Sequence, residues 1–297
     1  MGAIDTSFVK QYSDMLSHLL QQQDTRLRSK VMVDADFRGE YKFYEQLGQT
    51  AAVERTTRHQ DTPVIDPDHQ RRRVSSKDYL HAYLLDPEDQ LNMLVDPTSG
   101  YAQSQAMAFA RLQDQIIYAS LLGTAYTGKE GGTAVTLAGY QSGAHIITAS
   151  TGMAIDKILE AKLKLDLANN DPMQKRYIAV TSYEIRDLLN TTEVKSSDYN
   201  TVKALAAGQM NSFCGFEFIM LPPSSVTNGV ITRSSNVNSC VAFTEDAIRF
   251  AVKRDLQVRI EQRPDKNYAT QVWAAMTAGA VRMEEGKVVQ INVTNAS

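Results

Sequence analysis

The chain of 297 residues is poor in cysteine, proline, glycine and tryptophan, with counts of 2, 8, 16 and 1. Cys214 and Cys240 lie far apart and form no Cys-x-x-Cys pair, so they predict neither a disulfide framework nor a thiol metal site. The ordinary composition argues against a disordered, collagen-like or coiled-coil chain. A chain of this length can bury a large core, as one domain or two, without disulfides. We expect both cysteines to be small buried residues in a reducing compartment.

A long apolar run and an excess of one charge are also missing. No apolar stretch approaches the roughly 20 residues of a membrane span, and residues 1–5 lack the layout of a signal peptide. The 31 Lys and Arg residues nearly balance 34 Asp and Glu residues, which gives a formal charge of −3. A dedicated nucleic-acid binder relies on a basic excess. We therefore expect a soluble protein without a membrane partner, and bulk contact with DNA stays open.

Patterns that carry catalysis are weak. Residues 123–129 have the spacing of a phosphate-binding loop, but Glu130 stands where Ser or Thr should bind Mg²⁺, and the glycines follow a helix instead of a strand. The five histidines form no metal-binding spacing, and no Gly-x-Ser-x-Gly turn occurs. We predict no catalytic residue, no cofactor, no metal site and no enzymatic activity. A P-loop-like nucleotide-binding enzyme stays as a weak alternative, and a glycine-rich turn is the favoured interpretation.

Two strong helix patterns lie in the first half of the chain. Residues 4–23 carry apolar side chains at helical spacing, which predicts an amphipathic helix that docks either on its own domain or on a neighbouring subunit. The second pattern begins with Asp96 as a cap and Pro97 at the first helical position. It continues to about residue 122, a length of roughly 39 Å. This segment predicts a spine helix over residues 97–122.

Residues 41–80 are rich in charge and poor in apolar side chains. Segments 51–59 and 72–76 are rich in Val, Thr or Ser and flank a turn with two prolines, so we predict a long β-hairpin with its tip near residues 63–67. An isolated two-stranded ribbon is marginal in water, which means that the hairpin needs a partner surface. Strand alternation places Arg72 on one side and Arg71 and Arg73 on the other. The alternatives are a solvated loop or a nucleic-acid patch, and we favour ion pairs between subunits. The predicted interface residues are Glu54, Arg55, Arg58, Asp61, Asp66, Asp68, Arg71, Arg72 and Arg73.

The remaining chain alternates helices and strands. A second amphipathic helix carries its apolar residues at Ile155, Ile158, Leu159, Leu163 and Leu167. A strand at 176–181 leads through a capping box of Thr181 and Glu184 into a helix over 182–189. A further helix is predicted near residues 200–207. The predicted strands that follow cover residues 213–221, 239–243, 255–262, 268–283 and 289–293.

The sequence predicts, in order, an arm, a charged hairpin, a spine helix, a mixed α/β portion and closing strands. This order of parts resembles that of the major capsid proteins of tailed double-stranded DNA bacteriophages. The sequence is also similar to a subgroup of these coat proteins at several places. These are Gly48-Gln49-Thr50, Val53-Glu54-Arg55, residues 58–62, 69–73 and 79–89, Tyr101-Ala102 with Arg111 and Asp114, residues 267–282, and Val288-Val289. The similarity in the order of parts covers nearly the full chain, and no single motif is diagnostic.

The resemblance implies the fold and its division. The fold class is α+β, the tailed-phage major capsid fold with an N-terminal arm, an extended β-hairpin loop, a peripheral domain with a long spine helix and an axial α/β domain. The arm covers residues 1–40, the extended loop 41–80, the peripheral domain 81–175 and 245–285, and the axial domain 176–244 and 286–297.

The resemblance also implies the function and the partners. It implies a major capsid subunit that self-assembles into pentamers and hexamers of an icosahedral virion capsid, in the host bacterial cytoplasm, around double-stranded DNA. The chain begins almost at once with the arm, so a separate scaffolding protein is the expected partner. A portal and a decoration protein are further partners, and packaged DNA is a bulk contact without sequence specificity. Encapsulins, which are cellular compartment shells, share the fold and are the alternative.

Overall fold

The computed structural model describes residues 22–58, 61–62, 64–86, 98–149, 151–190 and 212–294. The chain divides into two compact units. Unit 1 comprises Met1–Asp24, Asp78–Leu112 and Arg254–Thr277, and unit 2 comprises Thr25–Lys77, Gln113–Lys253 and Ala278–Ser297. The helices predicted at residues 4–23 and near 200–207 lie outside the described residues, apart from Gln22 and Gln23, which are not helical.

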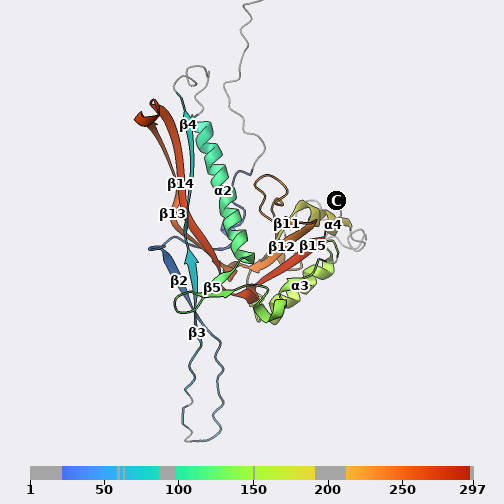
Figure 1. The fold of residues 1–297 in the computed structure, drawn as a ribbon. Coiled ribbons are helices and arrows are strands. Elements are labelled where there is room, and N and C mark those ends of the chain that lie inside the picture. The colour runs from blue at the N-terminus through green and yellow to red at the C-terminus, as the bar shows by residue number, and fades with distance from the viewer. Residues whose placement is uncertain are drawn as a thin grey trace, which may run out of the picture. The chain divides into compact units, whose positions relative to one another are not determined.

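Helix α2 (Thr98–Leu122) is the predicted spine helix (Figure 1). In unit 1, Gln105 on this helix is buried and donates a hydrogen bond to the carbonyl of Val272 at 2.8 Å. In unit 2, the Asp114 carboxylate accepts the backbone N–H groups of Arg26 and Leu27 at 3.0–3.1 Å. Each unit therefore fixes its own part of the helix through a buried polar contact.

A four-stranded sheet has the order β1-β13-β14-β4. Its strands are β1 (Met32–Asp34), β13 (Ile248–Arg263), β14 (Ala269–Arg282) and β4 (Lys77–Leu85), and η4 (Pro264–Lys266) joins β13 to β14. In unit 1, Tyr83 of β4 packs on Tyr101 of α2 with ring centroids 5.0 Å apart. This contact and the Gln105 hydrogen bond show that α2 covers one face of the sheet in that unit. The strands predicted at 255–262 and 268–283 are confirmed.

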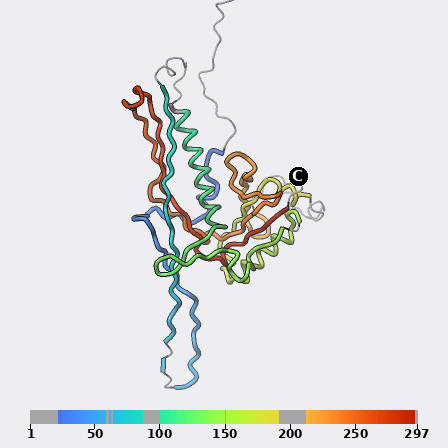
Figure 2. Tube along the Cα trace, viewed as in Figure 1, coloured from blue at the N-terminus to red at the C-terminus, as the bar shows by residue number. Residues whose placement is uncertain are grey.

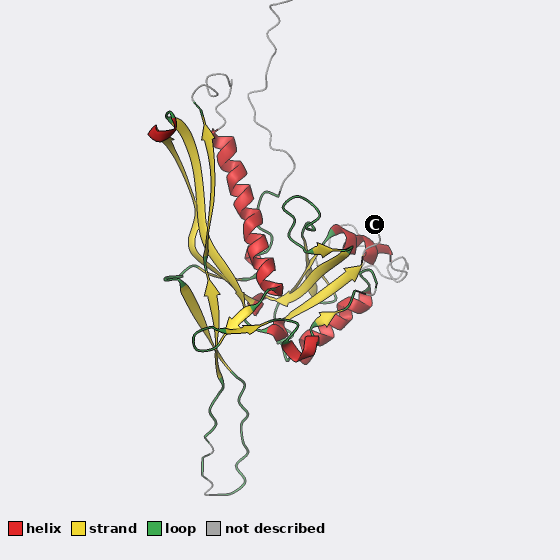
Figure 3. Ribbon diagram, in the orientation of Figure 1, coloured by secondary structure: helices red, strands yellow, loops and turns green. Residues whose placement is uncertain are grey.

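Unit 2 contains a mixed sheet in the order β7-β15-β12-β8-β10-β9, with β11 paired to β12. Figure 3 draws the strands in yellow and the helices in red. The strands are β7 (Ile146–Ile147), β15 (Val288–Thr294), β12 (Val237–Thr244), β8 (Arg176–Val180), β10 (Phe216–Met220), β9 (Ser212–Phe213) and β11 (Arg233–Ser234). Strand β8 is parallel to β10 and antiparallel to β12. The strands predicted at 176–181, 239–243 and 289–293 are confirmed.

The strand predicted over residues 213–221 is divided in the structure. Strands β9 and β10 pair with each other, and Cys214 and Gly215 turn between them at φ 52° and 86°. Both values lie in the left-handed region, which Gly adopts easily. The glycine therefore permits a tight turn where the apolar run alone predicts one strand.

Helices α3 (Ile155–Leu167) and α4 (Ser182–Asn190) contribute to one hydrophobic core with the unit 2 sheet. Ile158, Ala161 and Leu165 of α3 are fully buried in it. The predicted capping box at α4 is confirmed, since the Thr181 N–H donates to the Glu184 carboxylate at 2.7 Å. Helix α3 and strand β8 therefore contribute to the same core.

Candidate subunit interface

The predicted hairpin is formed by β2 (Tyr41–Leu47) and β3 (His69–Ser75), which pair antiparallel along their whole length. The Gly48 N–H adds one more bond, to the Asp68 carbonyl at 2.7 Å. Beyond this point the described residues of the two arms form no strand, so the prediction of a strand at 51–59 is wrong. At its base the hairpin belongs to a four-stranded sheet in the order β2-β3-β5-β6, which β5 (Ala125–Thr127) and β6 (Thr133–Val135) complete. The two added strands stabilise the base, because an isolated two-stranded hairpin is only marginally stable in water.

The loop beyond the paired strands is exposed and carries both charges and apolar groups. Figure 2 shows its arms running away from the paired strands. The six predicted interface residues of this loop, Glu54, Arg55, Arg58, Asp61, Asp66 and Asp68, are all exposed. Val53, Val64 and Ile65 are also exposed and lie outside any core. The described part of the loop therefore exposes both charged and apolar side chains.

The three consecutive arginines alternate as predicted. Arg71 is exposed and pairs with Glu45 on β2, with a guanidinium–carboxylate distance of 2.7 Å. Arg73 lies on the same side of β3, with its guanidinium 4.8 Å from the ring centroid of Tyr41 and 5.0 Å from that of Tyr126. Such stacking is favourable for a planar cation. Both side chains therefore have partners within their own chain.

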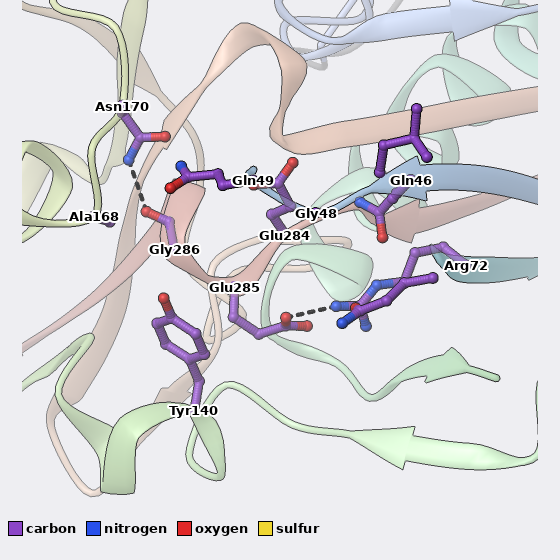
Figure 4. A pocket seen from close by; sticks show the side chains of 12 residues that line it. Gln46, Gly48, Gln49, Arg72, Tyr140, Ala168, Asn170, Glu284, Glu285 and Gly286 are labelled. Atoms are coloured by element: carbon purple, nitrogen blue, oxygen red, sulfur yellow. Dashed lines mark hydrogen bonds and ion pairs between the residues drawn. The ribbon is translucent and has the colours of Figure 1, made fainter. Parts of the chain in front are cut away.

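Arg72 points to the opposite side and is buried. Its side chain is 5% exposed, and its guanidinium lies 2.6 Å from the Glu285 carboxylate, which is 6% exposed (Figure 4). Arg72 was predicted to form ion pairs between subunits, and that prediction is wrong, since this charge is neutralised inside the chain. The sequence signal for the alternation was correct, but nothing local to β3 indicates a partner more than 200 residues away.

Glu285 belongs to η5 (Glu285–Lys287) and holds a second buried arginine, Arg282, at 3.4 Å. Arg282 also donates to the carbonyls of Leu121 at 2.6 Å and Gly123 at 2.9 Å, at the C-terminal end of α2. These carbonyls accept no hydrogen bond within the helix, so the Arg282 guanidinium supplies their donors. Its positive charge is also favourable beside the negative end of the helix dipole. Burial lowers the pKa of Arg282, and the Glu285 carboxylate opposes that shift. The triad of Arg72, Glu285 and Arg282 thus fastens the hairpin base to the core of unit 2.

A cavity of about 270 Å³ lies beside the hairpin base. The described residues that line it include Gln46, Gln70, Asn170 and Tyr140, and Asn170 donates to the Gly286 carbonyl at 2.8 Å (Figure 4). None of these described lining residues is a serine, cysteine or histidine. The lining also carries the carboxylates of Glu284 and Glu285, and that of Glu285 is paired with Arg72.

The stretch that resembled a phosphate-binding loop leads from the end of α2 into the β5–β6 hairpin. Gly128 has φ 96°, and Lys129 is exposed in the turn. The element after this turn is strand β6, so no helix N-terminus is available to bind phosphates there. The interpretation as a glycine-rich turn is confirmed.

The described part of the chain lacks two further features. No cluster of three or more histidine, cysteine, aspartate or glutamate side chains in that part could hold a metal ion. Its helices include none with the length and apolar character needed to cross a membrane.

Comparison with known proteins gave consistent matches. A family model described as phage capsid protein matches residues 4–295. The chain is similar in structure to the capsid of cyanophage P-SCSP1u, with a TM-score of 0.71 and 13% identity over 99% of this chain and 95% of that chain. It is similar to the capsid of Ralstonia phage GP4, with a TM-score of 0.74 and 12% identity over 98% and 96% of the chains. The capsid of Helicobacter pylori bacteriophage KHP30 gives a TM-score of 0.74 and 10% identity over 98% and 96%. No curated protein sequence matches the chain.

Proposed function

The chain belongs to the phage capsid protein family, and from this membership we propose that its copies assemble into pentamers and hexamers of an icosahedral shell around double-stranded DNA. The protein is a major capsid protein, a structural component of the virion capsid. The observation that carries the assembly proposal is the exposed hairpin loop, whose charges and apolar side chains lie outside any core.

The interface that we propose is the outer loop of the hairpin lying on a neighbouring subunit. Its residues are Glu54, Arg55, Arg58, Asp61, Asp66 and Asp68, and the exposed Val53, Val64 and Ile65 accompany them. Arg71 and Arg73 at the base, which also contact side chains of their own chain, complete the proposed interface. A partly covered ion pair contributes about 0.2–1 kcal/mol, a small energy that is multiplied through a closed shell.

The partners proposed with this function are a separate scaffolding protein, a portal and a decoration protein, with assembly in the host bacterial cytoplasm. Packaged DNA is proposed as a bulk contact without sequence specificity. The formal charge of −3 supports this role, because a shell must contain DNA without binding it tightly. We further propose that the chain has no enzymatic activity.

Light scattering after size exclusion, followed by electron microscopy, tests the function. We expect pentamers, hexamers or closed shells from the chain alone or with its scaffolding protein. A stable monomer over a wide concentration range, with and without scaffold, would contradict the proposal.

A further inference from the structure

Helix α3 carries two apolar faces, and only one of them is buried. Ile158, Ala161 and Leu165 pack into the unit 2 core. Leu159, Leu163 and Leu167 are 47%, 56% and 77% exposed. These three leucines are spaced by four residues, so they form one exposed ridge along the helix, whereas the buried set packs into the core. We call this surface the α3 ridge.

The α3 ridge has acidic neighbours. Asp156 and Glu160 are exposed on the same side of the helix. Glu160 is bonded to Lys164 at 3.2 Å, whereas no ion pair is seen for Asp156 with any described residue. The ridge therefore combines an apolar strip with negative charge near its N-terminal end.

A second exposed patch in unit 2 has the opposite character. Tyr183 of α4 and Met220 at the end of β10 are 37% and 46% exposed, and Ser182 links the two elements by a contact of its hydroxyl with the Met220 sulfur at 3.6 Å. The guanidinium groups of Arg186 and Arg233 lie 5.7 and 4.7 Å from the Tyr183 ring centroid. Arg186 also pairs with the neighbouring Asp187 carboxylate at 3.2 Å, whereas Arg233 forms no ion pair with any described residue. We call these four residues, Tyr183, Met220, Arg186 and Arg233, the Tyr183 patch, which is apolar and basic.

We propose that the α3 ridge of one copy packs against the Tyr183 patch of a second copy of this chain. Leucines then meet Tyr183 and Met220, and the acidic end of the ridge meets Arg233, with Arg186 beside it. The charge complementarity selects this pairing over ridge against ridge, which would bring Asp156 and Glu160 of two copies together. Because the two patches differ, the contact is head-to-tail, and a head-to-tail contact generates a ring when its rotation closes.

The size of the ridge also favours a second copy within an assembly. Three leucines and their neighbours cover less than the roughly 800 Å² per partner of a stable isolated complex. A contact of this size is therefore stable only together with other contacts between the same subunits. The hairpin loop supplies one such contact in the proposed assembly. The proposal rests on the proposed function, in which every subunit has neighbours of its own kind.

Cross-linking between introduced cysteines tests the pairing. We would combine Leu163→Cys and Met220→Cys in a Cys214→Ser background, since Cys214 is partly exposed while Cys240 is buried. A bismaleimide added to assembled particles should give a ladder of covalent oligomers that ends at pentamers and hexamers. Either single variant, Leu163→Cys or Met220→Cys, should stay monomeric on a denaturing gel. A ladder that stops at dimers, or no cross-link in intact particles, would overturn the proposal.

A second measurement uses the ridge itself. Changing Leu159, Leu163 and Leu167 to serine should leave the circular dichroism native and lower the yield of particles at least tenfold. The matched control is Met173→Ser, a 90% exposed apolar residue after the helix, which should assemble normally. Normal yield from the ridge variant would overturn the inference while wild-type assembly still supports the function. Failure of the wild type to assemble would instead contradict the function.

Discussion

At the scale of single residues, the fold depends on a few buried polar groups. The Glu285 carboxylate pairs with both Arg72 and Arg282, whose side chains are 5% and 0% exposed. Two guanidinium groups in such surroundings are costly without their carboxylate. The triad is therefore a point at which one substitution should release the hairpin base from the core.

We predict that Glu285→Ala lowers the free energy of unfolding by about 3–5 kcal/mol, since it leaves buried charges without a partner. The measurement is urea unfolding of dissociated subunits. Glu284→Ala is the matched control, because Glu284 is 53% exposed and its pair with Lys287 is a surface contact at 3.0 Å. Loss of the Glu284–Lys287 pair should lower the free energy of unfolding by about 0–1 kcal/mol. Equal effects of the two substitutions would contradict the role assigned to the triad.

Gly279 of β14 marks a close approach of two backbones. A Cβ at this position would lie 2.1 Å from the Ser75 carbonyl oxygen, at the end of β3. We predict that Gly279→Ala destabilises the protein by about 1–3 kcal/mol or more, measured by thermal unfolding. Gly132→Ala, where nothing lies within 4 Å, should be neutral or slightly stabilising. A neutral Gly279→Ala would mean that β3 and β14 do not need this contact.

Asp246 links two short helices and gives a pH dependence. Its carboxylate accepts hydrogen bonds from Lys287 and Thr244, each at 2.7 Å. Burial alone would raise the pKa of Asp246, but these bonds outweigh it and hold the pKa below the ordinary value of 3.8. The folded state is therefore stabilised above the unfolded pKa, and this stabilisation is lost as the pH falls through the folded pKa.

We predict that Asp246→Asn lowers the free energy of unfolding at pH 7 by about 1 kcal/mol and has less effect below about pH 4. Urea unfolding at both pH values measures the difference. A variant whose deficit stays constant down to pH 3 would show that the ionised carboxylate is not the stabilising form.

At the scale of elements, strong local signals predicted α2, β8 and the capping box of α4. Helix α2 begins within one residue of its predicted start, because a Pro at the first turn and apolar spacing act locally. The outer part of the hairpin was predicted wrongly as a strand, because the prediction rested on residue composition, and the β-propensity of Val, Thr and Ser depends strongly on context. The partner of Arg72 could not be predicted either, since Glu285 becomes its neighbour only through the fold.

Helix α3 shows a further limit of sequence patterns. Its apolar residues satisfy helical spacing in two ways, and spacing alone cannot tell which set faces the sheet. The buried set is Ile158, Ala161 and Leu165, whereas Leu159, Leu163 and Leu167 face outward. An alanine at the centre of the buried set permits close packing against the strands, and the bulkier leucines remain outside.

The hairpin should separate folding from assembly. We predict that the double substitution Arg55→Glu and Arg58→Glu leaves native circular dichroism but reduces assembly, because both residues lie on the exposed loop. Arg72→Glu should instead unfold the hairpin base, since it places a second carboxylate beside Glu285. Circular dichroism and particle counts by electron microscopy distinguish the two. Normal shells from the loop variant would mean that the hairpin charges are simply solvated and form no contact with a neighbouring subunit.

At the scale of the whole molecule, two kinds of contact are proposed for the shell, and they differ in physical character. The hairpin loop relies on exposed charges, whereas the α3 ridge relies mainly on leucine side chains. Exposed charges are screened within about 8 Å at physiological ionic strength and about 3 Å in 1 M salt. Burial of apolar surface is not weakened by such screening. Salt should therefore act on one contact and spare the other.

We predict that raising NaCl from 0.1 to about 1 M slows wild-type assembly, since it screens the hairpin contact. The neutral variant with Arg55→Gln and Arg58→Gln should assemble more slowly at low salt and respond less to added salt. The serine variant of the α3 ridge should keep the full salt response at its lower yield. Time-resolved light scattering at matched subunit concentrations measures all three. If the glutamine variant responds to salt as strongly as the wild type, the screened charges lie elsewhere, and the loop contact must depend on Val53, Val64 and Ile65 instead.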